Sequence, residues 1–298
     1  MSFEAMMERA KSADGFLAAL DQSGGSTPKA LKQYGVPDDA YVSGEESMYE
    51  MVHAMRSRII TAKPFTGEKV LGAILFENTM DREIEGIPTG QYLWEKKNII
   101  PFVKIDKGLA DEENGVQLMK PIPGLEDLLK RAKSKGFFGT KMRSVINSAN
   151  EEGIKAIVDQ QFAVGKQIIS FGLVPIIEPE VNIKADDNEL CEDILKACIM
   201  EQLDQLGDDE KVMLKLTLPT NVNHYKDCID HPKVVRVVAL SGGYSRDEAN
   251  EILAKQKGMI ASFSRALAEG LVYGSSDEEY ESVLTKSIDA IYEASKSG

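Results

Sequence analysis

The chain has 298 residues, of which 43% are hydrophobic, and a formal net charge of −13. A chain of this length can bury a large core. Its acidic balance, without a block rich in Lys or Arg, argues against nucleic acids and anionic membranes as partners. No segment is long and apolar enough to span a bilayer, and the first residues lack the apolar core of a signal peptide. Three cysteines without a C-x-x-C pair suit reduced thiols, so we expect a cytoplasmic protein.

Short apolar runs typical of buried strands alternate along the chain with amphipathic helical patterns. The strand-like runs are Gly15–Leu20, Val70–Phe76, Ile99–Ile105, Phe137–Met142, Leu173–Ile177, Val212–Leu218, Val234–Leu240 and Met259–Phe263. The helical patterns are Glu45–Ala62, Glu126–Ser134, Glu151–Ser170, Asp187–Leu206, Arg246–Ala254 and Asp277–Ser295. Eight buried strands alternating with helices predict an α/β fold, a (β/α)8 TIM barrel, with residues 1–298 as a single domain. A doubly wound open sheet is the alternative fold.

The barrel prediction also fixes where a functional site should lie, because active sites of that fold lie at the carboxyl ends of the strands. A barrel would bring residues at those ends together from distant parts of the sequence, which an open sheet would do less well. The polar residues at or near the predicted ends are Asp21, Lys104 with Asp106, Lys141 with Arg143, Glu178 with Glu180, Lys215, Ser241 and Arg265.

Lys215 stands inside the apolar run Val212–Pro219, where its amine cannot easily reach water. Burial disfavours the charged form of a lysine and lowers its pKa, and a neutral amine attacks carbonyl carbons. Lys104 and Lys141 occupy similar apolar runs, so we expect the three lysines to share one site. The alternative is an edge-strand lysine whose amine reaches solvent.

Two carboxylates follow the fifth predicted strand. Glu178 and Glu180 are two residues apart, so they share a face in an extended chain. A carboxylate near buried lysines can be tuned to move protons in either direction. In the alternative interpretation these carboxylates only neutralise the lysines.

Glycine turns follow two of the strands. Ser241-Gly242-Gly243 follows the seventh strand and precedes a helix, an arrangement that presents backbone N–H groups to an oxyanion. Arg265 follows the eighth strand, and a guanidinium is well suited to bind phosphate. A second turn, Asp21–Lys29, follows the first strand, and two such turns suit a substrate with phosphate at both ends. The alternative is an ordinary turn with a surface arginine.

Three histidines, His53, His224 and His231, show no metal-binding spacing, and no nucleotide-binding glycine motif follows a strand. The chemistry should therefore need no metal and no nucleotide.

Taken together and in this order, the segments resemble the class I (Schiff-base) fructose-1,6-bisphosphate aldolases, most closely their shorter bacterial branch. The resemblance runs nearly end to end. It rests on Ala18–Ser26, Val103–Gly108, Lys141–Arg143, Val174–Glu180, Leu214–Thr217, Leu240–Gly243 and Phe263–Leu267. It implies reversible cleavage of fructose 1,6-bisphosphate to dihydroxyacetone phosphate and glyceraldehyde 3-phosphate in glycolysis and gluconeogenesis, with no cofactor.

The resemblance also implies residue roles. Lys215 would form the Schiff base, and Glu178, with Glu180 beside it, would transfer protons as the iminium forms and resolves. Asp21 would accept the C4-hydroxyl proton, and Lys141 would hold Lys215 neutral by charge repulsion. The residues implied for the C1 phosphate are Ser241, Gly242, Gly243 and Arg265, and those for the other end of the substrate are Ser26, Lys104 and Arg143.

The chain departs from the animal pattern in two places. Lys215 lies in Leu-Lys-Leu-Thr-Leu-Pro, without the Lys-Pro-Asn of the animal enzymes, and the carboxyl terminus lacks their terminal tyrosine. Two other functions stay open. One is a Schiff-base aldolase or transaldolase for a different sugar phosphate, and the other is a sugar-phosphate-binding barrel without activity. The outer helix faces do not reveal the oligomeric state.

Overall fold

The computed structural model of the chain describes residues 2–23 and 25–297, so Gly24 of the first glycine turn lies outside the described residues. Eight parallel strands lie side by side in one row. Their order is β1 (Phe16–Leu20), β2 (Val70–Leu75), β5 (Ile100–Lys104), β7 (Gly139–Ile146), β8 (Val174–Val181), β9 (Val212–Thr217), β10 (Val234–Leu240) and β11 (Met259–Ala261).

The two ends of this row meet. The N–H of Ala19 in β1 donates to the carbonyl of Phe263, just beyond β11, at 3.2 Å. The chain therefore folds as a (β/α)8 barrel, and each strand overlaps one of the eight apolar runs. The barrel prediction is confirmed, and the open-sheet alternative is wrong.

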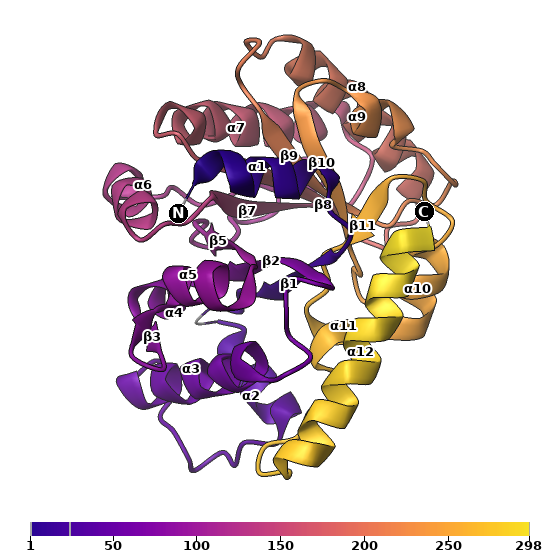
Figure 1. The fold of residues 1–298 in the computed structure, drawn as a ribbon. Coiled ribbons are helices and arrows are strands. Elements are labelled where there is room, and N and C mark those ends of the chain that lie inside the picture. The colour runs from indigo at the N-terminus through magenta and orange to yellow at the C-terminus, as the bar shows by residue number, and fades with distance from the viewer. Residues whose placement is uncertain (1, 24, 298) are drawn as a thin grey trace.

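Long helices surround the strands, which occupy the centre of Figure 1. The six predicted helical patterns are all confirmed within two residues at each end. They form α3 (Glu46–Thr61), α6 (Leu125–Ser134), α7 (Glu151–Ser170), α8 (Asn188–Asp204), α10 (Arg246–Leu253) and α12 (Asp277–Ser297). Side-chain caps fix two of the starts. Asn150 accepts from the N–H of Gly153 before α7, and Ser245 and Glu248 form a capping box on α10.

The structure also contains short elements that the sequence patterns did not predict. Apart from α1 each has eight residues or fewer, too few for a helical or alternating pattern to repeat. They are α1 (Phe3–Ser12), α2 (Thr27–Tyr34), α4 (Glu77–Asp81), α5 (Thr89–Gln91), η1 (Tyr92–Lys96), α9 (Lys226–Asp230), α11 (Arg265–Ala268), the hairpin of β3 (Glu83–Ile84) with β4 (Ile87–Pro88), and β6 (Val116–Gln117).

Strands β7 and β8 continue four residues beyond their predicted ends. Arg143 and Glu178 are register partners inside these strands, and Glu180 pairs with Val145. The sequence did not predict these extensions, because polar residues break the apolar runs and Pro179 has no N–H to donate to a neighbouring strand. Three site candidates therefore lie on rigid strand backbone and not in a loop.

Helix α1 closes the amino-terminal end of the barrel. The ring of Phe3 packs 4.9 Å from that of Phe138, and Met6 and Ala10 join the core inside the strands. Arg236 of β10 donates to the carbonyl oxygens of Ala10 and Ala13, which lack partners at a helix end. The carboxyl end of the barrel is left for a pocket.

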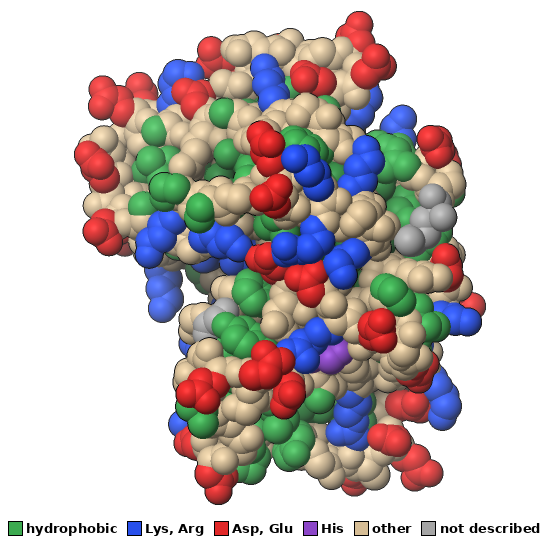
Figure 2. Space-filling model, turned by 90° about the vertical axis from the view of Figure 1, so that its left-hand side faces the viewer, with side chains coloured by type: hydrophobic (Ala, Val, Ile, Leu, Met, Phe, Trp, Pro, Cys, Tyr) green, Lys and Arg blue, Asp and Glu red, His purple; other side chains and the backbone are tan. Residues whose placement is uncertain are grey.

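Among the described residues no helix is both long and apolar enough to cross a membrane. Figure 2 shows one face of the molecule, on which acidic and basic side chains are mixed and hydrophobic side chains form only small separate groups.

Gly139 at the start of β7 allows the close approach of β8. A Cβ there would lie 2.2 Å from the backbone oxygen of Val174. We expect Gly139→Ala to lower the free energy of unfolding, measured by urea denaturation, by about 2 kcal/mol or more, because neither strand can yield without disturbing the barrel. Gly165→Ala in α7 is the control, since its Cβ would meet nothing closer than 3.6 Å. Helix propensity predicts a gain of about 0.5–1 kcal/mol there. Equal stability of the two variants would contradict this account of the strand spacing.

Candidate active site

A pocket of about 950 Å³ opens at the carboxyl ends of the strands. Gly243 does not line it, but a Cβ there would lie 3.7 Å from Nη2 of Arg265, so the glycine stands beside a residue that does. The other eleven site residues expected from the sequence all line the pocket: Asp21, Ser26, Lys104, Lys141, Arg143, Glu178, Glu180, Lys215, Ser241, Gly242 and Arg265.

Four buried charged side chains form the centre of the pocket, each from a different strand or strand end. Nζ of Lys141 lies 2.8 Å from Oδ2 of Asp21 and 2.7 Å from Oε2 of Glu178. Nζ of Lys215 lies 3.2 Å from Oε1 of Glu178. All four residues are at most 8% exposed. The carboxylate of Glu178 therefore stands between two amines, at ion-pair distance from both.

Electrostatics fix the charge state of two members of this cluster. Burial alone would raise the pKa of the Asp21 carboxyl, but the positive charges of Lys141 and Lys215 outweigh it and lower the pKa. Burial alone would lower the pKa of Lys141, but Asp21 and Glu178 outweigh it and raise the pKa. Asp21 is therefore held ionised and Lys141 protonated.

The cations expected at the far end of the substrate already have carboxylate partners. Nζ of Lys104 lies 2.8 Å from Oδ1 of Asp106, and Arg143 pairs with Glu180. Burial lowers the pKa of Arg143, and Glu180 more than offsets this. Glu180 thus contacts a guanidinium, whereas Glu178 contacts the amines. The sequence places Asp106 at a strand end but predicts no role for it, because the partner of its carboxylate depends on how the side chains are oriented in the fold.

The turn after β10 has a backbone that requires its two glycines. Gly242 and Gly243 have φ of 61° and 126°, which favour glycine, and a Cβ on Gly242 would lie 2.7 Å from Ile183. Arg265 begins α11 and is exposed at the pocket mouth. Across the pocket, the hydroxyl of Ser26 accepts from the N–H of Ser23 at 3.1 Å, so this serine is engaged in its own turn.

Two buried polar residues that the sequence analysis missed fix the backbone of β8. Oε1 of Gln161 on α7 accepts from the N–H of Glu178 at 2.9 Å, and its Nε2 donates to Oγ of Ser144 at 3.0 Å. Thr217 bonds the N–H and the carbonyl of Val181 at 2.9 and 2.8 Å. The signal for Gln161 was its place on the apolar face of a helix, where an unpaired amide would be costly.

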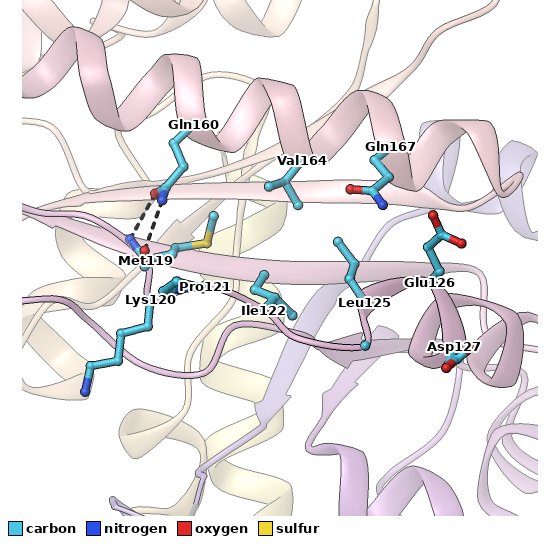
Figure 3. A pocket seen from close by; sticks show the side chains of 11 residues that line it. Met119, Lys120, Pro121, Ile122, Leu125, Glu126, Asp127, Gln160, Val164 and Gln167 are labelled. Carbon is cyan, nitrogen blue, oxygen red and sulfur yellow. Dashed lines mark hydrogen bonds between the residues drawn. The ribbon is translucent and has the colours of Figure 1, made fainter.

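A second cavity, a groove of about 490 Å³, lies outside this pocket, between α7 and the segment that leads into α6. In Figure 3 Val164 and Leu125 point into the groove, and Gln160 is bonded twice to the backbone of Met119. Those bonds are 2.9 and 3.0 Å long. None of the expected site residues lines this groove. Within residues 2–23 and 25–297, no group of three or more His, Cys, Asp and Glu side chains is arranged to hold a metal ion.

Buried lysines and carboxylates at the carboxyl end of a (β/α)8 barrel are the arrangement that an aldolase using a lysine needs. The family model described as fructose-bisphosphate aldolase class-I matches residues 5–232. The fructose-bisphosphate aldolase class 1 of Synechocystis sp. is 56% identical over 289 residues, which cover 97% of this chain and 96% of that protein. The chain belongs to the class I fructose-bisphosphate aldolase family, and it is a lyase.

Solved structures show the same fold. The fructose-bisphosphate aldolase of Plasmodium falciparum superposes with a TM-score of 0.76 at 22% identity, covering 99% of this chain and 94% of that one. Cgl0159 of Corynebacterium glutamicum has a TM-score of 0.57 at 11% identity, covering 98% and 92%. The fold is therefore preserved where most of the sequence has changed.

Gln161 and its neighbour Gln160 offer a matched test of the site. Gln161→Leu leaves the N–H of Glu178 without a partner, so we expect stability to fall by about 1–3 kcal/mol and turnover to fall at least tenfold as the carboxylate shifts. Gln160→Leu also removes two amide hydrogen bonds, but at the groove, and turnover should stay within twofold of wild type. Steady-state kinetics and urea unfolding measure both. Equal turnover in the two variants would show that Gln161 does not hold Glu178 in place.

Proposed function

We propose that the chain cleaves fructose 1,6-bisphosphate reversibly through a Schiff base on Lys215, as one domain spanning residues 1–298. It would act in the cytoplasm and need no metal or other cofactor. The observation that carries this proposal is the 3.2 Å contact between Nζ of Lys215 and Oε1 of Glu178, inside a pocket with cations on both sides. The products are dihydroxyacetone phosphate and glyceraldehyde 3-phosphate.

Imine formation uses the two groups in that contact. The Lys215 ammonium gives its proton to the Glu178 carboxylate, and the free amine attacks C2 of the open-chain ketose. The attached nitrogen gives up one proton to the C2 oxygen, and Glu178 returns the other, so that the oxygen leaves as water and an iminium with one N–H remains. Lys141, held protonated 2.7 Å from the same carboxylate, would keep Glu178 in place beside Lys215 during these transfers.

Carbon–carbon cleavage uses Asp21. As the C3–C4 bond breaks, its electron pair moves into the iminium and forms a neutral enamine. The C4 hydroxyl becomes the aldehyde of glyceraldehyde 3-phosphate and gives its proton to Asp21. The lowered pKa of Asp21 keeps it ionised and ready to accept. Protonation of the enamine at C3 and hydrolysis of the imine then free dihydroxyacetone phosphate and Lys215.

The phosphates act through binding at a distance from the reacting bond. Ser241, the glycine turn and Arg265 would hold the C1 phosphate, and the rigid β10 end fixes the distance from that turn to Lys215. At the other end Lys104 and Arg143, with Ser26, would exchange part of their contact with Asp106 and Glu180 for the second phosphate. The internal partners keep these cations oriented in the free enzyme.

Lys215 should be the residue that becomes covalently attached. Borohydride reduction in the presence of dihydroxyacetone phosphate should place the adduct on Lys215, as read by peptide mass spectrometry. Lys211 is the control within the wild-type chain. It begins the segment before β9, and its amine donates to the carbonyl oxygens of Asp208 and Pro232 outside the pocket. An adduct on Lys104, Lys141 or Lys211 would contradict the assignment of Lys215 as the Schiff-base residue.

Arg265 should contribute to binding and not to the chemical step. Arg265→Ala removes a charge-assisted hydrogen-bonding group worth about 1.5–3 kcal/mol, so affinity for fructose 1,6-bisphosphate and fructose 1-phosphate should weaken roughly ten- to over a hundredfold. Arg246→Ala is the control, since Arg246 lies outside the pocket and donates to Ser287. Glu178→Gln should bind nearly normally but turn over far more slowly. Unchanged affinity of Arg265→Ala for both substrates would place the phosphate elsewhere.

A further inference from the structure

Arg56 is a fully buried arginine just behind the pocket, on α3. Its Nη2 donates to the backbone oxygen of Gln22 at 2.5 Å and to Oε1 of the same residue at 3.3 Å. Its Nη1 donates to Oγ1 of Thr79 on α4 at 2.7 Å. The guanidinium therefore holds the residue that directly follows Asp21 and ties it to the segment after β2.

The cost of burying this group indicates that it does more than fill space. Its hydrogen-bond partners are uncharged oxygens. Burial lowers the pKa of Arg56 to about 10, and the negative charge of Asp21 opposes that shift. A buried charge stabilises a fold poorly compared with an apolar side chain of the same size. An apolar side chain could not donate the hydrogen bonds that the guanidinium makes to both oxygens of Gln22.

Gln22 extends the link across the place where the barrel closes. β11 has only three residues, and the N–H of Ala19 reaches across to Phe263 at 3.2 Å. Closer to the pocket, Nε2 of Gln22 donates to Oγ of Ser264 at 2.7 Å. Gln22 follows Asp21, and Ser264 precedes Arg265. One side-chain hydrogen bond thus joins the residue after the proton acceptor to the residue before the arginine at the pocket mouth, and Arg56 anchors it through Gln22.

We propose that Arg56 and Gln22 are positioning residues that fix Asp21 relative to Arg265, so that the C1 phosphate and the C4 hydroxyl of one substrate are engaged together. This inference rests on the proposed function. Without the link, phosphate binding and imine formation persist, but Asp21 drifts from the C4 hydroxyl. Because a displacement of about 1 Å can cost on the order of a hundredfold in rate, the loss falls on carbon–carbon cleavage.

The test compares variants that break the link with variants that keep it. Gln22→Leu and Ser264→Ala remove the bond between these two side chains, at half-buried positions where we expect the fold to be kept. Arg56→Met removes the guanidinium that holds Gln22. Gln22→Glu keeps it, since a carboxylate accepts from Arg56 and from the Ser264 hydroxyl. Arg236→Met is the matched control, because Arg236 also donates to two backbone carbonyls, at the opposite end of the barrel.

Two quantities are measured for each protein: kcat and KM with fructose 1,6-bisphosphate, and the rate of borohydride trapping at saturating dihydroxyacetone phosphate. We expect Gln22→Leu to lower kcat roughly ten- to a hundredfold while KM and the trapping rate stay within about threefold of wild type. Ser264→Ala should lose less, and Gln22→Glu should recover most of the rate. Arg236→Met should keep the wild-type kcat.

The inference is overturned if Gln22→Leu keeps a kcat within twofold of wild type. It is also overturned if kcat and trapping fall in parallel, or if Gln22→Glu is as slow as Gln22→Leu, because either result means general damage to the pocket. Failure of the proposed function looks different, since wild-type enzyme would then give no adduct on Lys215. That result would overturn both proposals.

Discussion

The pocket depends on the contacts of one ammonium group with two carboxylates, those of Lys141 with Asp21 and Glu178. A charge buried this deeply must be compensated locally, and removing one member leaves its partners buried without compensation. With Lys215 the cluster contains two positive and two negative groups, so its formal charges cancel. Because the four side chains come from the end of β1 and from β7, β8 and β9, they can meet only when these strands have assembled into the curved sheet.

The fold could be predicted closely because its signals are local. The strand signal of an apolar run such as Val234–Leu240 lies in its own residues, and so does the helical signal of the long amphipathic patterns. The same holds for Lys215, whose mid-strand position was visible in the sequence alone. Prediction was limited where the sequence signal is short, as in α2 and α11, or broken, as in β8, where polar residues and Pro179 end the apolar run before the strand ends.

Partners in space were harder to predict than positions in the chain. The sequence places Glu178 and Glu180 on one face, but it does not say that one meets the amines and the other meets Arg143. It gives no hint that Arg56 reaches Gln22, 34 residues earlier. Such pairings are set by the tilt and stagger of the strands, which a single sequence does not encode in any local pattern. Residues that support the site are therefore the ones most easily missed.

The helix across the amino-terminal end of the barrel has a consequence for the order of events during synthesis. Helix α1 precedes every strand of the barrel in the chain, yet Arg236, which bonds its last carbonyls, lies on β10. Met6 and Ala10 pack against an interior that exists only when strands from both ends of the chain have assembled. The nascent helix must therefore wait, with its apolar side uncovered, until more than two hundred further residues have been made. Docking of α1 on the barrel is therefore a late step of folding, and a chaperone that covers the apolar side of α1 would act before that step.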